Sequence, residues 1–248
     1  MKSEISLDHR ATLRYSSVLF DLDGTLVDSA DGVVASVRYA LRQLDARRDP
    51  PDRDTILMEV GKPLEQVMAE LGYPAEPDRT RRFVEAYRQH YAEHIREGLR
   101  PFPDTFETLT ALRAAGARLA IVTTKQQAQA ELTLAAVGIR EFFDVVVGWH
   151  EGRKHKPDPE PFLDALARLG DHRSSPLDAG PQTPDPALRH SALVVGDTEQ
   201  DIIGARAASI DSCAVTYGFR PATMLRGLRP DYMVGWLFDV VGIVEQSA

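Results

Sequence analysis

Cysteine is nearly absent from this sequence, with Cys213 the only one in 248 residues. A single cysteine cannot form an internal disulfide, so the chain fits a reducing compartment, and we expect a cytoplasmic location. Cys213 begins the apolar run Cys213-Ala214-Val215. This setting predicts a buried, unreactive thiol in the core rather than a nucleophile.

Positive charge and long apolar runs are also scarce. Lysine and arginine number 29 against 37 acidic residues, for a formal net charge of -8. This balance does not favour nucleic acid or an anionic membrane as a partner, so anionic ligands need a local site. No stretch reaches the roughly 20 apolar residues of a membrane span. Residues 1–14 are polar and lack the apolar core of a secretory signal.

Short apolar runs, most of them followed by a polar turn, recur along the chain. Ser17–Phe20, Arg118–Val122 and Ala192–Val195 lead into turns that contain aspartate, threonine or lysine. Two further runs are Val145–Val147 and Ser212–Thr216. Continuous runs with β-branched residues are typical of strands buried on both faces of a parallel sheet.

Helical patterns fill the intervals between these runs. They cover residues 105–115, 126–137, 161–169 and 201–208, and the first three end next to Gly116, Gly138 and Gly170. A glycine just past the last periodic residue is a common helix terminator. Strands that alternate with helices predict a doubly wound, mostly parallel α/β sheet.

The segment of residues 29–100 has only helical periods. Ser29 can cap a first helix, and apolar residues recur three and four apart in the stretches 33–44, 64–71 and 83–95. We therefore predict an α/β core of residues 15–28 and 101–248, with a strand-free helical domain of residues 29–100 inserted in it. The proline-rich residues 171–190 are long for a connection, and we expect a surface insertion, with a functional lid as the lesser alternative.

Polar residues follow the predicted strands and could meet at one edge of the sheet, outside the carboxyl ends of the strands. They are Asp21, Asp23, Thr123, Lys156, Asp197 and Asp201. Phosphoryl transfer needs a nucleophile, a cation, donors for the developing charge and an acid for the leaving group. Asp21 could be the nucleophile, and Asp23 the acid and then the base. Clustered carboxylates need a hard cation, for which oxygen ligands favour Mg²⁺.

The same residues carry a resemblance to a known family. Phe20–Ser29, which reads FDLDGTLVDS, resembles the first motif of the phosphatase branch of the haloacid dehalogenase superfamily. Val122-Thr123, Lys156-Pro157 and Gly196–Asp201 resemble its second, third and fourth motifs, in the family's order. Val60–Met68 resembles the cap loop of phosphoglycolate-phosphatase-like members. The helical insert would then be the family's cap, which closes over the substrate.

The resemblance implies a role for each motif residue. Asp21 would be the phosphorylated nucleophile and a metal ligand. Asp23 would be the general acid and base, and its backbone carbonyl would also bind the metal. Asp197 would bind Mg²⁺ directly, and Asp201 would hold metal-bound water.

The remaining motif residues would bind phosphate. Thr123 would do so with backbone amides near Asp23 and Thr124, although asparagine is common at the position of Thr124 in that group. Lys156 would pair with both phosphate and carboxylate. The expected partner is a small phosphorylated metabolite, and the chain could be a monomer or a homodimer.

Simpler interpretations exist for each feature. Asp21 and Asp23 could form a turn with Asx hydrogen bonds, and Thr123 could cap the following helix. Asp197 and Asp201 could be a solvated helix start. Lys62 and Glu65 could touch substrate from the insert, but a solvated helix start is at least as good an interpretation. His150, Glu151 and His155 suggest zinc, but their spacing matches no familiar site.

The alternative functions are either other reactions at the same site or a protein that has no catalytic activity. A pyrophosphatase, a nucleotidase or a phosphosugar mutase could carry these motifs. A mutase is disfavoured because Leu64 stands near the cap position expected to hold an arginine for a second phosphate. A dehalogenase is disfavoured by Asp23, which that branch lacks. A non-catalytic binding protein is disfavoured because both Asp21 and Asp23 are present.

Overall fold

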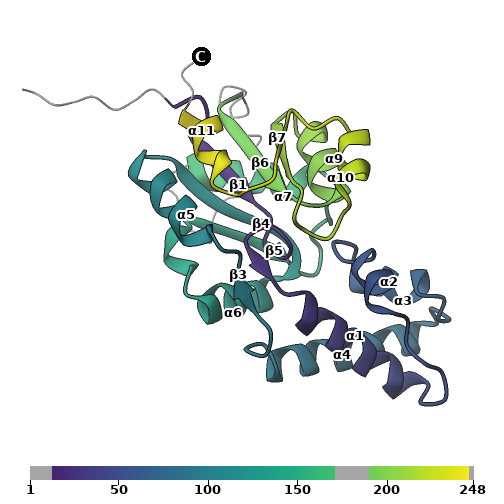
Figure 1. Ribbon diagram of the computed structural model, residues 1–248. Coiled ribbons are helices and arrows are strands. Elements are labelled where there is room, and N and C mark those ends of the chain that lie inside the picture. The colour runs from purple at the N-terminus through teal and green to yellow at the C-terminus, as the bar shows by residue number, and fades with distance from the viewer. Residues whose placement is uncertain (1–12, 171–189, 246–248) are drawn as a thin grey trace, which may run out of the picture.

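The structure is a computed structural model that describes residues 13–170 and 190–245. Figure 1 shows a central sheet flanked by helices, with a group of helices set to one side of it. None of the helices in the described ranges combines the length and the apolar character needed to cross a bilayer. The predicted insertion at 171–190 falls almost entirely outside the described residues.

A six-stranded parallel sheet forms the centre of the core, in the order β5-β4-β1-β6-β7-β8. The strands are β1 (Ser17–Phe20), β4 (Arg118–Gln126), β5 (Val145–Trp149), β6 (Ala192–Gly196), β7 (Asp211–Val215) and β8 (Tyr232–Val234). The predicted mostly parallel sheet is therefore confirmed. Strand β8 has no counterpart among the predicted strands, because three residues are too short a run to give a strand signal.

Helices cover both faces of the sheet, because successive side chains of a strand point to opposite faces. Val18 and Phe20 face a core shared with α5 (Thr105–Ala114), α6 (Gln127–Val137) and α11 (Asp239–Glu245). Leu19 faces the opposite layer, which contains α7 (Glu160–Gly170) and α9 (Glu199–Ala207). The short α10 (Ala222–Gly227) packs beside α9, and the 3-10 helix η1 (Arg140–Phe142) precedes β5.

Four helices between β1 and β4 surround a separate apolar core. They are α1 (Ala30–Leu44), α2 (Arg53–Leu57), α3 (Leu64–Glu70) and α4 (Pro77–Glu93), and we call them the cap. Val37, Met68 and Tyr87 are buried in this core. Helices α1 and α4 share the most extensive contact within the cap. The apolar residues of both helices follow the helical period.

A small antiparallel ribbon connects the cap to the core. It pairs β2 (Val27–Asp28) with β3 (Arg100–Pro101). Arg100, which we expected in a strand-free segment, therefore lies in a strand opposite Asp28. The prediction was wrong at this residue because the pairing joins positions far apart in the sequence, and no local pattern reveals it.

Candidate active site

The carboxyl edge of the sheet collects polar residues at or near the ends of three neighbouring strands. Phe20 at the end of β1 pairs with Ile121 of β4 and Val195 of β6. Asp21 follows Phe20 by one residue, and Thr123 and Asp197 follow Ile121 and Val195 by two residues each. All three residues therefore lie near the same edge of the sheet. Ligands of open α/β sheets bind at this edge.

Asp21, Asp197 and Asp201 form a buried carboxylate cluster, with one oxygen from each lying within 4.8 Å of the others. Burial raises the pKa of Asp21 to about 7, although the Lys156 ammonium opposes this. Burial and the charges of Asp21 and Asp201 also raise the pKa of Asp197. A hard divalent cation would favour the ionised forms, and carboxylate oxygens are ligands that Mg²⁺ prefers. These three residues therefore fit a magnesium ion.

Lys156 lies against the cluster from the loop that precedes α7. Its Nζ is 2.8 Å from Asp21 Oδ1 and 2.6 Å from Asp201 Oδ1, and it donates to the carbonyl of Val122 at 2.9 Å. Burial alone would lower the pKa of Lys156, but the two carboxylates outweigh burial and raise it. One ammonium among three carboxylates leaves negative charge for a cation to balance.

Hydrogen bonds orient the two carboxylates that follow β6. Thr25 Oγ1 donates to Asp197 Oδ1 at 2.9 Å, and the amide of Phe219 donates to Asp197 Oδ2 at 2.7 Å. The amide and hydroxyl of Thr198 donate to Asp201 Oδ2 at 3.1 and 2.8 Å, at the N-terminus of α9. Asp197 and Asp201 are 0% and 1% exposed, so the solvated-helix interpretation is wrong.

Asp23 lies beside a buried lysine that the sequence analysis assigned no role. Lys125 Nζ is 2.9 Å from Asp23 Oδ1 and donates to the Tyr91 hydroxyl of α4 at 2.8 Å. Burial would lower the pKa of Lys125, but Asp23 and Tyr91 raise it more. The only signal in the sequence was its place at the strand end, two residues after Thr123. Lys125 thus connects the candidate acid to the cap.

Thr123 and Thr124 both lie within β4. The Thr123 hydroxyl accepts a hydrogen bond from the amide of Lys125 at 3.2 Å, and Thr124 lines a cavity below the cap. Because β4 continues to Gln126, α6 begins only at Gln127. Thr123 is therefore not the cap of that helix, and that alternative is wrong.

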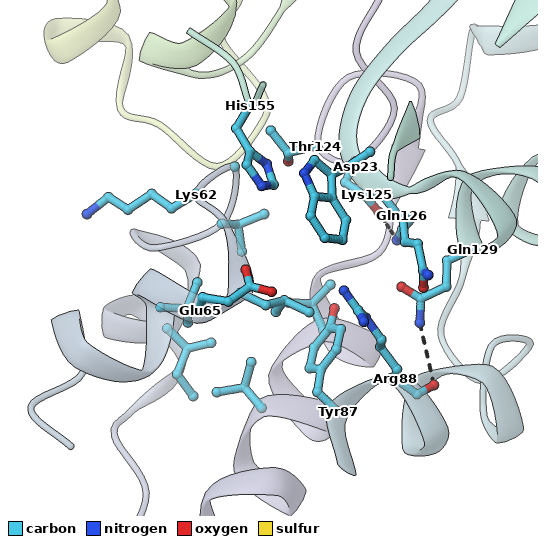
Figure 2. Close-up of a pocket in the computed structure, with 18 residues that line it drawn as sticks. Asp23, Lys62, Glu65, Tyr87, Arg88, Thr124, Lys125, Gln126, Gln129 and His155 are labelled. Carbon is cyan, nitrogen blue, oxygen red and sulfur yellow. Dashed lines mark hydrogen bonds and ion pairs between the residues drawn. The ribbon is translucent and has the colours of Figure 1, made fainter. Parts of the chain in front are cut away.

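A cavity lies between the cap and this edge of the sheet, and Figure 2 shows the residues that line it. Asp23, Thr124 and Lys125 contribute from the core, beside the carboxylate cluster. Lys62 and Glu65 contribute from the cap. A substrate whose reacting group met Asp21 would place its remaining atoms here.

Arg220 is a second residue that the sequence analysis missed. Its guanidinium is buried, pairs with Glu199 at 2.6 Å, and donates to the cap carbonyls of Leu57 at 3.1 Å and Val60 at 2.8 Å. It therefore ties the core to the cap loop that borders the cavity.

The zinc alternative at His150, Glu151 and His155 is wrong. Within the described part of the chain, the only metal-compatible group of such side chains is the aspartate cluster. The His155 ring instead stacks on Trp149, with ring centroids 5.0 Å apart and planes at 12°. His150 Nε2 accepts a hydrogen bond from Arg153 at 3.2 Å.

Comparison with known proteins identifies the family. The pattern of the family described as haloacid dehalogenase-like hydrolase matches residues 18–215, which include all four strand-end motifs. This chain is a haloacid dehalogenase-like hydrolase.

Similar members of the family bear phosphatase names. Pyrophosphatase PpaX of Halalkalibacterium halodurans is 30% identical over 95% of this chain and its own full length. A Dickeya dadantii protein named "Probable phosphatase IndB" is 34% identical over 91% of each chain. A solved haloacid dehalogenase-like hydrolase from Streptococcus pneumoniae has a TM-score of 0.76 and 28% identity, over 92% of this chain and 98% of that one. The chain thus belongs with the phosphatases of this hydrolase family.

Proposed function

We propose that this hydrolase removes phosphate from a small phosphorylated metabolite, with Asp21 as the nucleophile and Mg²⁺ as the cofactor. The observation that carries the proposal is the position of Asp21. Its carboxylate lies 2.8 Å from Lys156 and within the magnesium-compatible cluster, at the edge where α/β sheets bind ligands. Asp23 borders the adjoining cavity, where the leaving group would lie.

The reaction proceeds in two displacements. An Asp21 carboxylate oxygen attacks phosphorus, the bond from phosphorus to the leaving oxygen breaks, and Asp23 donates a proton to that oxygen. A water molecule then attacks the phosphorus of the aspartyl phosphate. Asp23 takes a proton from this water, the bond to Asp21 breaks, and inorganic phosphate and the starting carboxylate result.

The other site residues stabilise charge and orientation. Asp21, Asp197 and Asp201 would hold Mg²⁺, with the backbone carbonyl of Asp23 as a further ligand. The bound ion would supply positive charge against the phosphoryl oxygens. Lys156 adds a second positive charge beside Asp21, and Thr123 and Thr124 would donate hydrogen bonds to the phosphate.

Pyrophosphate is the second candidate substrate, because a relative that aligns with 95% of this chain is named a pyrophosphatase. The chemistry at Asp21 would be the same, with phosphate as the leaving group. Phosphoglycolate is the candidate that the resemblance of the cap loop suggests. Substrate choice then depends on the cavity below the cap.

Substitution of Asp21 by asparagine tests the mechanism. With Mg²⁺ present, we expect Asp21→Asn to lower the rate of phosphate release by a factor of about 10⁴ or more, because the nucleophile is lost while the shape remains. The measurement is phosphate release from a panel of phosphate monoesters and pyrophosphate, with circular dichroism to check folding.

The matched control is Asp49→Asn, which changes an exposed aspartate of the cap and should leave the rate unchanged. A near-normal rate in Asp21→Asn would refute the assignment of the nucleophile. If the wild-type protein released no phosphate from any compound, the alternative of a non-catalytic binding protein would replace the proposal.

A further inference from the structure

The cavity beside Asp23 has a mainly aliphatic wall on the side of the cap. Six side chains form it, namely Val33, Val37, Ile56, Val60, Leu64 and Val67. Tyr87 of the cap, labelled in Figure 2, and Trp149 of the core add aromatic surface to the lining. A pocket of this kind favours an apolar ligand body, because binding removes apolar surface from water.

Two of the three cations that line the cavity are already paired. Lys125 pairs with Asp23 at 2.9 Å, and both side chains are nearly buried. Lys62 pairs with Glu59 at 2.5 Å on the cap. The paired carboxylate offsets most of the positive charge that each ammonium would present to an anionic leaving group.

The third cation, Arg88, forms no ion pair among the described residues, but an unpaired carboxylate lines the same cavity. Its guanidinium lies over the ring of Trp149, with Cζ 5.6 Å from the ring centroid. Glu65 lines the same cavity and forms no ion pair among the described residues. Of the charged residues that line the cavity, Asp23 and Glu65 stand against Lys62, Lys125 and Arg88. Glu59, which pairs with Lys62 outside the lining, brings the formal charge of the group to zero.

We propose that this cavity selects phosphate monoesters whose leaving group is uncharged and carries an apolar ring, over those that carry a carboxylate or a second phosphate. The inference rests on the proposed function, since it concerns the leaving group of the same reaction. Phosphoglycolate and pyrophosphate would each bring a second anion beside Asp23 and Glu65. A ring attached through a short alkyl chain would instead lie against the aliphatic wall and the two aromatic side chains.

The test compares 2-phenylethyl phosphate with phosphoglycolate, because both release a primary alcohol and differ mainly in the ring and the carboxylate. For the wild-type protein with Mg²⁺, we expect kcat/KM to be at least about tenfold higher for 2-phenylethyl phosphate. Pyrophosphate should also be the poorer substrate. Calorimetric titration of Asp21→Asn should show the same order of affinity without turnover.

A pair of leucine variants locates the preference. Leu64→Asn places an amide in the aliphatic wall and should reduce the preference for 2-phenylethyl phosphate at least about fivefold, with a smaller change for phosphoglycolate. Leu132→Asn is the matched control, since Leu132 lies on α6 outside the cavity and is 51% exposed. It should leave the ratio of the two kcat/KM values unchanged.

The outcomes separate the inference from the function on which it rests. Equal kcat/KM values, or higher values for phosphoglycolate or pyrophosphate, would overturn the substrate class while leaving the phosphatase intact. If no compound released phosphate and Asp21→Asn bound none of them, the proposed function would fail as well.

Discussion

Asp197 is packed between two glycines, each of which allows a close approach of the backbone. A Cβ at Gly24, whose φ is +87°, would lie 2.3 Å from Asp197 Oδ2. A Cβ at Gly218 would lie 2.3 Å from Asp197 Cβ. Any larger residue at these positions would therefore displace a carboxylate of the proposed magnesium site.

Substitution of Gly218 by alanine should weaken magnesium binding. Because the new methyl group must push Asp197 away from its position, we expect the Kd for Mg²⁺ to rise by about tenfold or more in calorimetric titration. Gly227→Ala is the control, since a Cβ there meets no atom within 4 Å. An unchanged Kd in Gly218→Ala would show that Asp197 is not a ligand.

The contact between the cap and the core depends on Arg220. Removing its guanidinium in Arg220→Met would leave Glu199 without its partner and two cap carbonyls without their donor. We expect the free energy of unfolding to fall by about 3 kcal/mol, measured by urea denaturation. Arg81→Met breaks an exposed pair with Asp78 and should cost less than about 1 kcal/mol. If the free energy of unfolding fell equally in Arg220→Met and Arg81→Met, Arg220 would not stabilise the contact between the cap and the core.

His90, near the end of helix α4, is a pH-sensitive residue. His90 stacks on His94 with ring centroids 4.2 Å apart, and its Nδ1 lies 3.0 Å from Ser36 Oγ of α1. Burial, with a contribution from His94, lowers the pKa of His90 below its usual 6.5. The folded protein therefore binds this proton less readily than the unfolded chain does.

The pH dependence of unfolding should reflect that shift. The stability that neutral His90 contributes is fully present above pH 6.5 and is lost as the pH falls through its lower folded-state pKa. In His90→Gln, we expect a smaller loss of stability between pH 7 and pH 5 than in the wild-type protein. Urea midpoints across this range measure it, and identical slopes for the two proteins would exclude a contribution from His90.

Magnesium should stabilise the molecule as a whole, because two segments distant in the sequence, residues 21–23 and 197–201, supply its proposed ligands. An ion that binds only the folded state adds about 2.7 kcal/mol at a concentration 100 times its Kd. For a chain of this length we expect the Tm to rise by roughly 5–10 °C, measured by calorimetry with Mg²⁺ and with a chelator. Asp197→Asn should show a smaller rise than Asp49→Asn. An equal rise in both would place the ion elsewhere.

The order of residue types along the chain was enough to predict most of the sheet and most of the site. Apolar runs such as Ser17–Phe20 predicted strands, because residues buried on both faces must be apolar throughout. The polar residues after those runs had to meet at one edge, because parallel strands end on the same side. Asp21, Lys156 and Asp201 could therefore be assigned to one site before any distance was known.

Which charges compensate one another, and which residues enclose the cavity, depends on how the folded elements pack. Lys125 faces Asp23 across 102 positions of sequence, and Arg220 reaches the carbonyl of Val60 across 160. The pairing of Asp28 with Arg100 likewise depends on how the cap returns to the core. Such contacts arise when separate elements pack, and a local pattern of residue types carries no information about which distant partner a side chain will meet.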